Sequence, residues 1–384
     1  MGEPNVVIVI GPGVAADPGL LRQVAETEWR ALGVPGRLVV VGGPTALWDV
    51  LTAAGQDETC AVVVLHGPDV AVRPVLSRPG PHAARTVWYD TGLPGPAEVA
   101  TGSVRMAGRG IWGLAWAVRH AVHRLRHPAR RVPYGPAADQ WAELRLPDVR
   151  GGAPVPVAVL VHGGFWRSIW GADLMDALAI DLAARGYAAW NLEYRRPDQH
   201  GWQSTTADVA DGFGALTALA TGSAPPPAAG PAIEDGPPLD PERIAVVGHS
   251  AGGQLAFRLA ADAGGVALAV SLAGVLDLAE ADRRRLGTGA VAGALGGTRE
   301  EVPWVYAAAD PLTRLPLGVP QLVVQGTGDD LDMIDMSRRY AAAAQAAGDD
   351  VVHLERPGDH FDVIDPASPA WQATAAELAR RLRP

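Results

Sequence analysis

A serine stands between an apolar run and a helical pattern. Residues 243–253 read Arg-Ile-Ala-Val-Val-Gly-His-Ser-Ala-Gly-Gly, and apolar residues take up helical spacing from Gln254 onward. This arrangement predicts a buried strand, a sharp turn and a helix, with Ser250 at the apex. Glycines at 248 and 252 let the strand and helix approach each other, and they place the Ala251 amide and the helix N-terminus beside the hydroxyl. We therefore predict Ser250 as a nucleophile.

A serine hydroxyl needs a base to take its proton, and the base needs an acid to orient it. One downstream apolar run ends in a polar loop that carries Asp329, Asp330 and Asp332, and the last apolar run is followed by His360. Loops of this kind meet at the carboxyl edge of a parallel sheet. We predict His360 as the base and Asp329 as the acid. Asp330 and Asp332 remain alternatives, since at least one of the three aspartates is expected to cap the next helix.

A third apolar run ends in His162, Gly163 and Gly164. Successive glycines expose backbone amides, which suits stabilisation of an oxyanion together with the Ala251 amide. A plain turn with a structural histidine is the alternative. The candidate substrate-binding residues beside these groups are His162, Phe165, Trp166 and His249, and Trp170 and Trp202 could complete an aromatic wall.

Four motifs resemble the kynurenine formamidase (arylformamidase) and esterase branch of the α/β hydrolases. They are His-Gly-Gly-Phe-Trp-Arg at 162–167, Asn-Leu-Glu-Tyr-Arg-Arg at 191–196, Gly-His-Ser-Ala-Gly-Gly at 248–253 and Asp-His-Phe-Asp-Val-Ile-Asp-Pro at 359–366. The order serine, aspartate, histidine is also that of the fold. The resemblance covers residues ~132–384 and implies hydrolysis of a small ester or amide, with Gly163, Gly164 and Ala251 around the oxyanion. Glu193 and Tyr194 follow a strand and either face the pocket or pack against the next loop.

Strand and helix patterns also alternate over the first ~127 residues, which predicts a parallel sheet covered by helices. Gly11-Pro12 and residues 108–118 resemble type II 3-dehydroquinate dehydratase, which implies a flavodoxin-like fold. The family's Glu-Val-His segment is Thr86-Val87-Trp88 here. The loop after the first strand is also too short to form the lid that carries arginine and tyrosine in that family. We expect a non-catalytic relative that supports oligomerisation. Binding of an aromatic or cyclic acid at His66-Gly67-Pro68 is the alternative.

The predicted fold class is therefore α/β throughout. A flavodoxin-like domain at residues 1–127 precedes an α/β-hydrolase catalytic domain at residues 128–384, and the proline-rich and charged stretch 126–136 is the expected linker. Residues 224–231 are expected to form a mobile surface loop. Residues 277–316 are the expected lid and specificity element.

Composition excludes several classes of function. The formal net charge of -10 disfavours binding to nucleic acid or to a membrane surface. The chain has no lysine, which excludes Schiff-base chemistry and a phosphate-loop lysine. The single cysteine, Cys60, is expected to be buried. His120, His123 and His127 are interpreted as part of a solvated basic helix face, and no metal, cofactor or membrane anchor is expected. We expect a cytoplasmic protein.

Other functions stay open at this point. The same triad could pass the acyl group to another acceptor, as in an acyltransferase or cyclase. The first domain could be a dehydratase with the hydrolase half as a scaffold, or the whole chain could be an oligomeric binding module. Small-molecule hydrolysis is the leading hypothesis.

Overall fold

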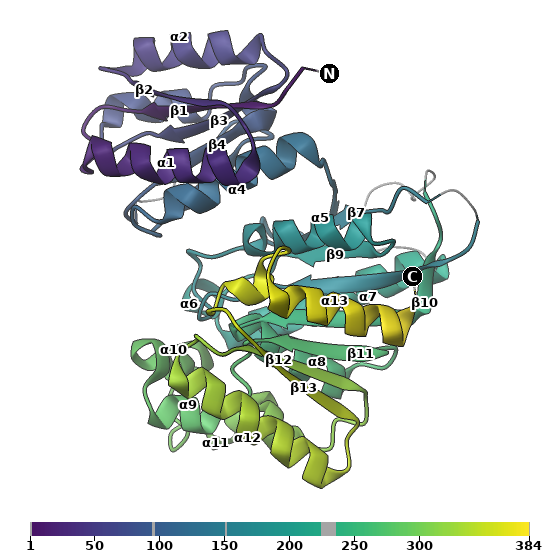
Figure 1. Cartoon of the computed structure of the whole chain (residues 1–384). Helices are drawn as coiled ribbons and strands as arrows, with labels where there is room; N and C mark the ends of the chain where they lie inside the picture. The colour runs from purple at the N-terminus through teal and green to yellow at the C-terminus, as the bar shows by residue number, and fades with distance from the viewer. Residues whose placement is uncertain (1, 94–96, 150–151, 224–235, 384) are drawn as a thin grey trace. The chain divides into compact units, whose positions relative to one another are not determined.

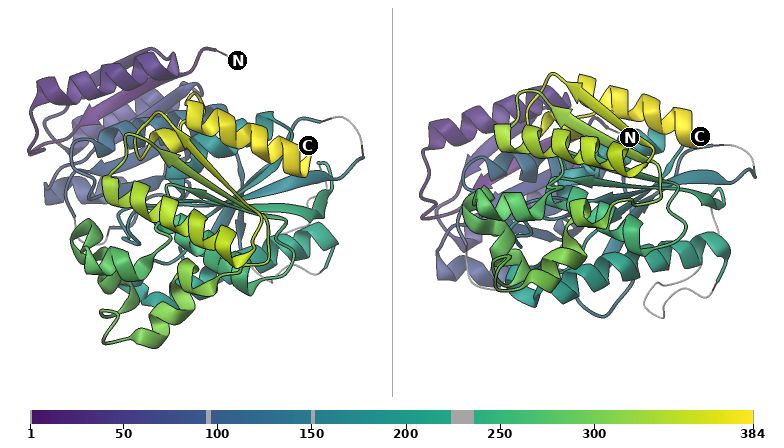
Figure 2. Two further views of the ribbon diagram at one scale, coloured as in Figure 1. Left: turned by 60° about the horizontal axis from the view of Figure 1, so that its bottom comes forward. Right: turned by 90° about the horizontal axis from the view of Figure 1, so that it is seen from below.

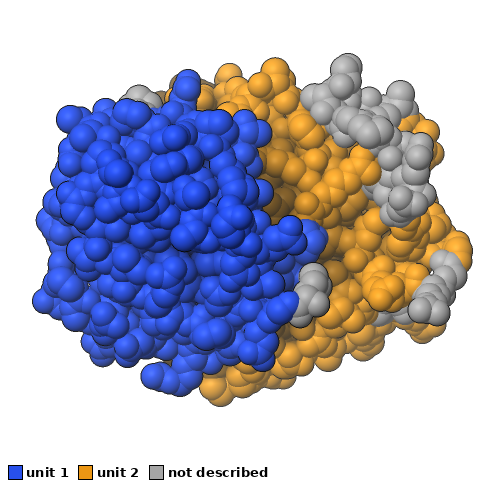
Figure 3. Space-filling view, turned by 90° about the horizontal axis from the view of Figure 1, so that it is seen from above, with its two compact units in different colours: residues 1–128 blue, residues 129–384 orange. Residues whose placement is uncertain are grey.

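The computed structural model describes residues 2–93, 97–149, 152–223 and 236–383. The chain divides into two compact units, Met1–Pro128 and Ala129–Pro384 (Figure 3). Separate clusters of buried apolar side chains lie within each unit. The surface loop expected at residues 224–231 lies outside the described residues.

The first unit is a parallel sheet between helices (Figure 1). Its strands are β1 (Asn5–Ile10), β2 (Gly36–Val40), β3 (Cys60–Leu65), β4 (Thr86–Asp90) and β5 (Val104–Ala107). Its α-helices are α1 (Pro18–Leu32), α2 (Pro44–Gly55), α3 (Arg73–Leu76) and α4 (Gly113–Arg126). The strands follow the order β2-β1-β3-β4-β5, and every neighbouring pair is parallel.

Helices cover both faces of this sheet. Side chains of α2 and α3 pack into the core cluster formed with β1 and β3, whereas α1 and α4 contact each other and are joined by Arg119, which donates to Glu28 at 2.6 and 2.9 Å. The central strand β3 is therefore buried at every position, as its run of small and β-branched residues predicts. Cys60 at its start is buried, which confirms that prediction.

The second unit is a larger sheet that carries the predicted site. Its strands are β6 (Arg130–Pro133), β7 (Trp141–Arg145), β8 (Val155–Val161), β9 (Ala188–Leu192), β10 (Leu239–His249), β11 (Leu268–Leu272), β12 (Gln321–Gly326) and β13 (Val351–Arg356). Its α-helices are α5 (Asp176–Ala184), α6 (Pro197–His200), α7 (Trp202–Thr221), α8 (Ala251–Asp262), α9 (Leu278–Arg283), α10 (Leu286–Leu295), α11 (Pro303–Ala309), α12 (Leu331–Ala347) and α13 (Pro369–Leu382).

The strands follow the order β13-β12-β11-β10-β8-β9-β7-β6. They run parallel from β13 to β9, and β7 and β6 are antiparallel additions at one edge. Helices lie on both faces (Figure 2). On one face α13 contacts α5, where Trp371 donates from Nε1 to Asp181 at 2.6 Å. Elsewhere α8 contacts α7 and α12, and the rings of Phe257 and Tyr340 meet edge to face at 5.4 Å.

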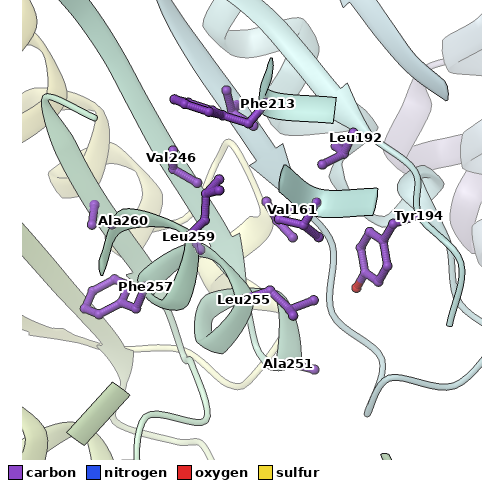
Figure 4. Close-up of a cluster of buried hydrophobic side chains, with 14 of the residues drawn as sticks. Val161, Leu192, Tyr194, Phe213, Val246, Ala251, Leu255, Phe257, Leu259 and Ala260 are labelled. Atoms are coloured by element: carbon purple, nitrogen blue, oxygen red, sulfur yellow. The ribbon is translucent and has the colours of Figure 1, made fainter. Parts of the chain in front are cut away.

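The core of this unit forms a rigid base under the predicted nucleophile. Side chains of β8, β10 and α8 interdigitate, among them Val161, Val246, Leu255 and Leu259 (Figure 4). Full burial of one such side chain contributes about 1.5–3 kcal/mol. The turn between β10 and α8 is therefore held between two well-packed elements.

The structure corrects one expectation at the start of this unit. Part of the stretch expected to be a linker, residues 130–133, is the edge strand β6, which pairs antiparallel with β7. Val132 is fully buried in that strand, and the proline at its end is tolerated because an edge strand has no second partner. The short strand β5 was not predicted either.

In the described part of the chain, no helix is long and apolar enough to cross a membrane.

Candidate active site

The predicted site residues converge on the carboxyl edge of the second sheet. Ser250 follows β10, Gly163 follows β8, Asp329 follows β12 and His360 follows β13. These strands are parallel, so the loops that leave them share one edge. Residues that are far apart in the sequence are gathered by strand order alone.

The sharp turn predicted at Ser250 is present, and its backbone is strained. Ser250 has φ 54° and ψ -121°, in a region that side chains rarely adopt. The strand and helix meet so closely that a Cβ added at Gly248 would lie 2.0 Å from the Gly252 carbonyl oxygen. The Ser250 amide donates to the Leu272 carbonyl at 2.9 Å, which fixes the turn to β11. Ala251 is the first residue of α8, where an amide has no acceptor within the helix.

Gly163 lies directly beside the serine. A Cβ at Gly163 would be 2.7 Å from the Ser250 Cβ and 2.6 Å from the His249 carbonyl oxygen. Beyond it, Gly164, Phe165 and Trp166 all have positive φ values, of 110°, 53° and 55°. The backbone after β8 therefore turns sharply next to the predicted nucleophile, as a loop that presents amides to an oxyanion would.

The imidazole of His360 is oriented by Asp329. His360 donates from Nδ1 to Asp329 Oδ2 at 2.8 Å, which leaves Nε2 as the nitrogen that can accept a proton. Asp329 also accepts from the Gln325 side chain and the Asp330 amide, both at 2.7 Å. Burial opposes ionisation of Asp329, but the hydrogen bond and charge of His360 outweigh it and lower the pKa of the carboxyl.

His249 connects the serine turn to the His360 loop. Its Nε2 donates to the His360 carbonyl oxygen at 3.0 Å, and the two rings lie 4.9 Å apart. Burial, with a smaller contribution from the charge of His360, lowers the pKa of His249 to about 3. The ring is therefore neutral at pH 7 and acts as a hydrogen-bond donor that anchors the histidine loop.

The candidate substrate-binding residues differ in exposure. His162, Trp166 and His249 are 0%, 1% and 1% exposed, and Trp166 donates from Nε1 to Gln254 at 3.1 Å. Their positions favour support of the surrounding loops over direct contact with substrate. Phe165 is partly exposed, and it is the candidate whose side chain is open to a bound molecule. The Trp166 and Trp202 rings meet edge to face at 6.5 Å.

The segment expected to be a lid is mostly helical and contains α9, α10 and α11. Gln254 ties it to the site, because the same side chain accepts from Trp166 and donates to the Ala309 carbonyl at 2.8 Å. A Cβ at Gly287 would lie 2.7 Å from the Phe165 ring, so this segment forms one wall beside that side chain. It also lines an open, charged cavity of about 680 Å³ whose walls include none of the predicted triad.

Sequence reasoning missed Gln254 and left the role of Glu193 open. Gln254 is fully buried on an otherwise apolar helix face, and a lone polar residue at such a position is the signal that could have found it. Glu193 accepts from the Ala172 amide and lies 3.1 Å from His162 Nε2. Among the described residues no group of three or more His, Cys, Asp or Glu side chains is placed to hold a metal ion.

The sheet order, the serine turn and the oriented histidine together define a class of protein. Residues 158–364 match the family model described as alpha/beta hydrolase fold. This match covers more than half of the chain, which therefore belongs to that family.

Several known proteins are similar to this chain. Esterase LipC of Mycobacterium tuberculosis is 28% identical over 291 residues, which span 68% of this chain and 66% of that protein, just under two thirds of its length. A bacterial heroin esterase superposes with a TM-score of 0.52 at 23% identity, covering 67% of this chain and 83% of that one. Esterase B from Lactobacillus rhamnosis superposes with a TM-score of 0.53 at 19% identity, covering 69% and 89%. These superpositions show the shared fold.

Proposed function

We propose that the protein is a serine hydrolase that cleaves a small carboxylic ester through an acyl-enzyme. Ser250 attacks the carbonyl carbon while His360 takes its proton, and His360 then returns the proton to the leaving alcohol. In the second step His360 takes a proton from water, which attacks the acyl-enzyme, and returns the proton to the Ser250 oxygen as the acid product leaves. Asp329 holds the imidazole in the required tautomer.

One observation carries this proposal: the His360–Asp329 pair is linked to the strained serine turn through His249. The 2.8 Å bond orients the ring, and His249, the neighbour of Ser250, holds the His360 main chain at 3.0 Å. The amides of Gly163, Gly164 and Ala251 surround the place where the oxyanion forms. One donor of this kind lowers the barrier by about 2.7–4 kcal/mol.

An ester is the favoured substrate class because the similar proteins described above are named as esterases. The resemblance to kynurenine formamidases favours a small formyl amide as the alternative. The leaving group differs between the two, so p-nitrophenyl esters of graded chain length assayed beside N-formylkynurenine distinguish them.

The nucleophile is tested with a fluorophosphonate probe. We expect the probe to label the wild-type protein on Ser250, as located by peptide mass spectrometry. Ser250→Ala should lose the label, and its kcat for the best ester should fall by about 10⁴–10⁶-fold. Ser103→Ala, which removes a hydroxyl in the first unit, is the matched control and should behave as wild type. Labelling of Ser250→Ala to the wild-type extent would contradict the proposal.

We propose that the first unit is a non-catalytic, flavodoxin-like domain that supports self-association. Its strand order, β2-β1-β3-β4-β5, supports the flavodoxin-like fold, because flavodoxin-like sheets have the order 2-1-3-4-5. Thr86 and Trp88, which replace the acidic and histidine positions of the dehydratase motif, are buried in the sheet. Light scattering of the full chain and of residues 129–384 tests the association. An oligomer that survives removal of the first unit would contradict it.

A further inference from the structure

The loop that carries the predicted oxyanion amides depends on contacts with other elements for much of its shape. It runs from His162 to Ala172, between β8 and a short 3₁₀ turn at Ala172–Met175. Positive φ values at Phe165 and Trp166 store backbone strain, and such conformations persist only when the surroundings fix them. Contacts in the middle of the loop, such as those of Ser168 with Asp198, and the groups at its two ends together decide where its amides lie.

One buried carboxylate contacts both ends. Glu193 is 6% exposed and follows β9, the neighbour of β8 in the sheet. Val161 pairs with Leu192 across these strands, so the next residues, His162 and Glu193, emerge side by side. Glu193 Oε1 lies 3.1 Å from His162 Nε2, and Oε2 accepts from the Ala172 amide at 3.0 Å.

The backbone amides and the guanidinium that contact this carboxylate are all donors. Besides the two loop ends, Glu193 accepts from the Tyr194 amide at 3.0 Å and from Arg196. Arg196, which is itself buried, also pairs with the partly exposed Asp139 at 3.2 Å. Burial opposes ionisation of Glu193, but Arg196 and His162 outweigh it and lower its pKa to about 2. A neutral amide side chain would present a donor to another donor.

Neighbouring side chains reinforce the same two ends. The Tyr194 hydroxyl donates to the His162 carbonyl at 2.7 Å, and its ring stacks on the His162 ring at 4.3 Å. Asn191 donates from its side chain to the Ala172 carbonyl at 2.9 Å. Gly171 is required beside Ala172, because a Cβ there would lie 2.6 Å from the Glu193 carboxylate.

We infer that Glu193 is the positioning residue of the oxyanion hole. Its ionised carboxylate spans the ends of the loop and sets the Gly163 and Gly164 amides relative to Ser250, although it touches neither the substrate nor the reacting atoms. This inference rests on the proposed function, because it assigns those amides to the stabilisation of a developing oxyanion.

The test replaces Glu193 by Gln in the full chain. We expect kcat for the best p-nitrophenyl ester to fall by about 10²-fold, as for a small misplacement of catalytic groups. KM should change little, because the lost interaction acts in the transition state. Hydrogen exchange should accelerate at the amides of Arg167 and Trp170, which donate within the loop.

Asp208→Asn is the matched control. Asp208 is also a fully buried carboxylate, and it accepts from the Arg195 amide, the Arg195 guanidinium and the Gln140 side chain. It should lower stability while leaving kcat and the exchange of the 162–172 loop unchanged. If Glu193→Gln does not fold, Tyr194→Phe tests the same clamp by removing one bond to His162, with an expected loss of about 10-fold in kcat.

Two sets of outcomes separate the inference from the function on which it rests. Wild-type kcat in Glu193→Gln, equal losses of kcat in Glu193→Gln and Asp208→Asn, or a loss without faster exchange in the loop would each overturn the positioning role. A wild-type protein that hydrolyses no ester or amide would overturn the proposed function. The exchange comparison needs no turnover, so it still decides whether Glu193 fixes the loop.

Discussion

Three neighbouring aspartates follow β12, and they occupy different environments. Asp329 accepts from His360. Asp330 is the N-cap of α12 and accepts from the Asp332 amide at 2.8 Å, whereas Asp332 pairs with Arg284 at 2.7 Å. The geometry supports Asp329 as the acid and gives the other two ordinary structural roles.

Matched alanine substitutions test this division of roles. Asp329→Ala removes the group that orients His360, so we expect kcat to fall by about 10⁴-fold. Asp330→Ala removes only a helix cap, so we expect unchanged kcat and a loss of about 1 kcal/mol in the free energy of unfolding. Ester hydrolysis and urea unfolding of both variants give the two quantities.

The reverse pattern would reassign the acid. If Asp330→Ala lost activity while Asp329→Ala kept it, the contact between Asp329 and His360 would be structural. Retained fluorophosphonate labelling in a slow Asp329→Ala variant would show that Ser250 is still correctly placed.

At the scale of elements, the site depends on how closely β10 and α8 approach. Gly248 faces the Gly252 carbonyl, and Gly252 in turn faces the Val161 carbonyl. A Cβ added at Gly252 would lie 2.1 Å from the Val161 carbonyl oxygen. Backbone atoms cannot move aside as a flexible side chain can. The two glycines therefore allow strand, helix and β8 to meet around Ser250.

Gly248→Ala should separate these elements. We expect a loss of at least about 1–3 kcal/mol in the free energy of unfolding, as for overpacking in a core, together with most of the activity. Gly214→Ala is the control, since Gly214 is an exposed position of α7 with no heavy atom within 4 Å of an added Cβ. It should stabilise the protein by about 0.5–1 kcal/mol, because alanine is the better helix former. Denaturant unfolding and fluorophosphonate labelling measure both effects, and a fully stable, active Gly248→Ala would contradict the close approach.

At the scale of the whole molecule, the chain consists of two units, and the site lies within the second. The partners named above for Ser250, His360, Asp329 and Glu193 all lie in residues 129–384. That unit has its own buried core. Catalysis therefore should not require any group of the first unit.

Residues 129–384 produced alone should fold and hydrolyse the same esters with the kcat/KM of the full chain. The physical reason is that a domain with its own core folds independently. Circular dichroism and steady-state kinetics test this, with Ser250→Ala in the shortened chain as the background control. A folded but inactive second unit would show that the first unit contributes to the site.

Much of the second unit could be predicted because its patterns are local. The apolar run before Ser250, the glycines around it and the helical spacing after it determine a strand, a turn and a helix wherever they lie in a fold. The order of the serine, aspartate and histidine loops can likewise be read directly from the sequence. Edge strands such as β6 were missed because their short patterns resemble loops, and only pairing with β7 decides them.

The amino-acid sequence by itself determined the buried central strands, the turn at Ser250 and the polar loops that follow these strands, since these follow from backbone preference and the spacing of apolar residues. Tertiary structure decided which aspartate faces His360, that His162, Trp166 and His249 are buried, and that Glu193 joins both ends of the loop after β8. Those outcomes depend on the register between strands that are distant in sequence and on the direction of side chains across a sheet edge. No local pattern specifies either.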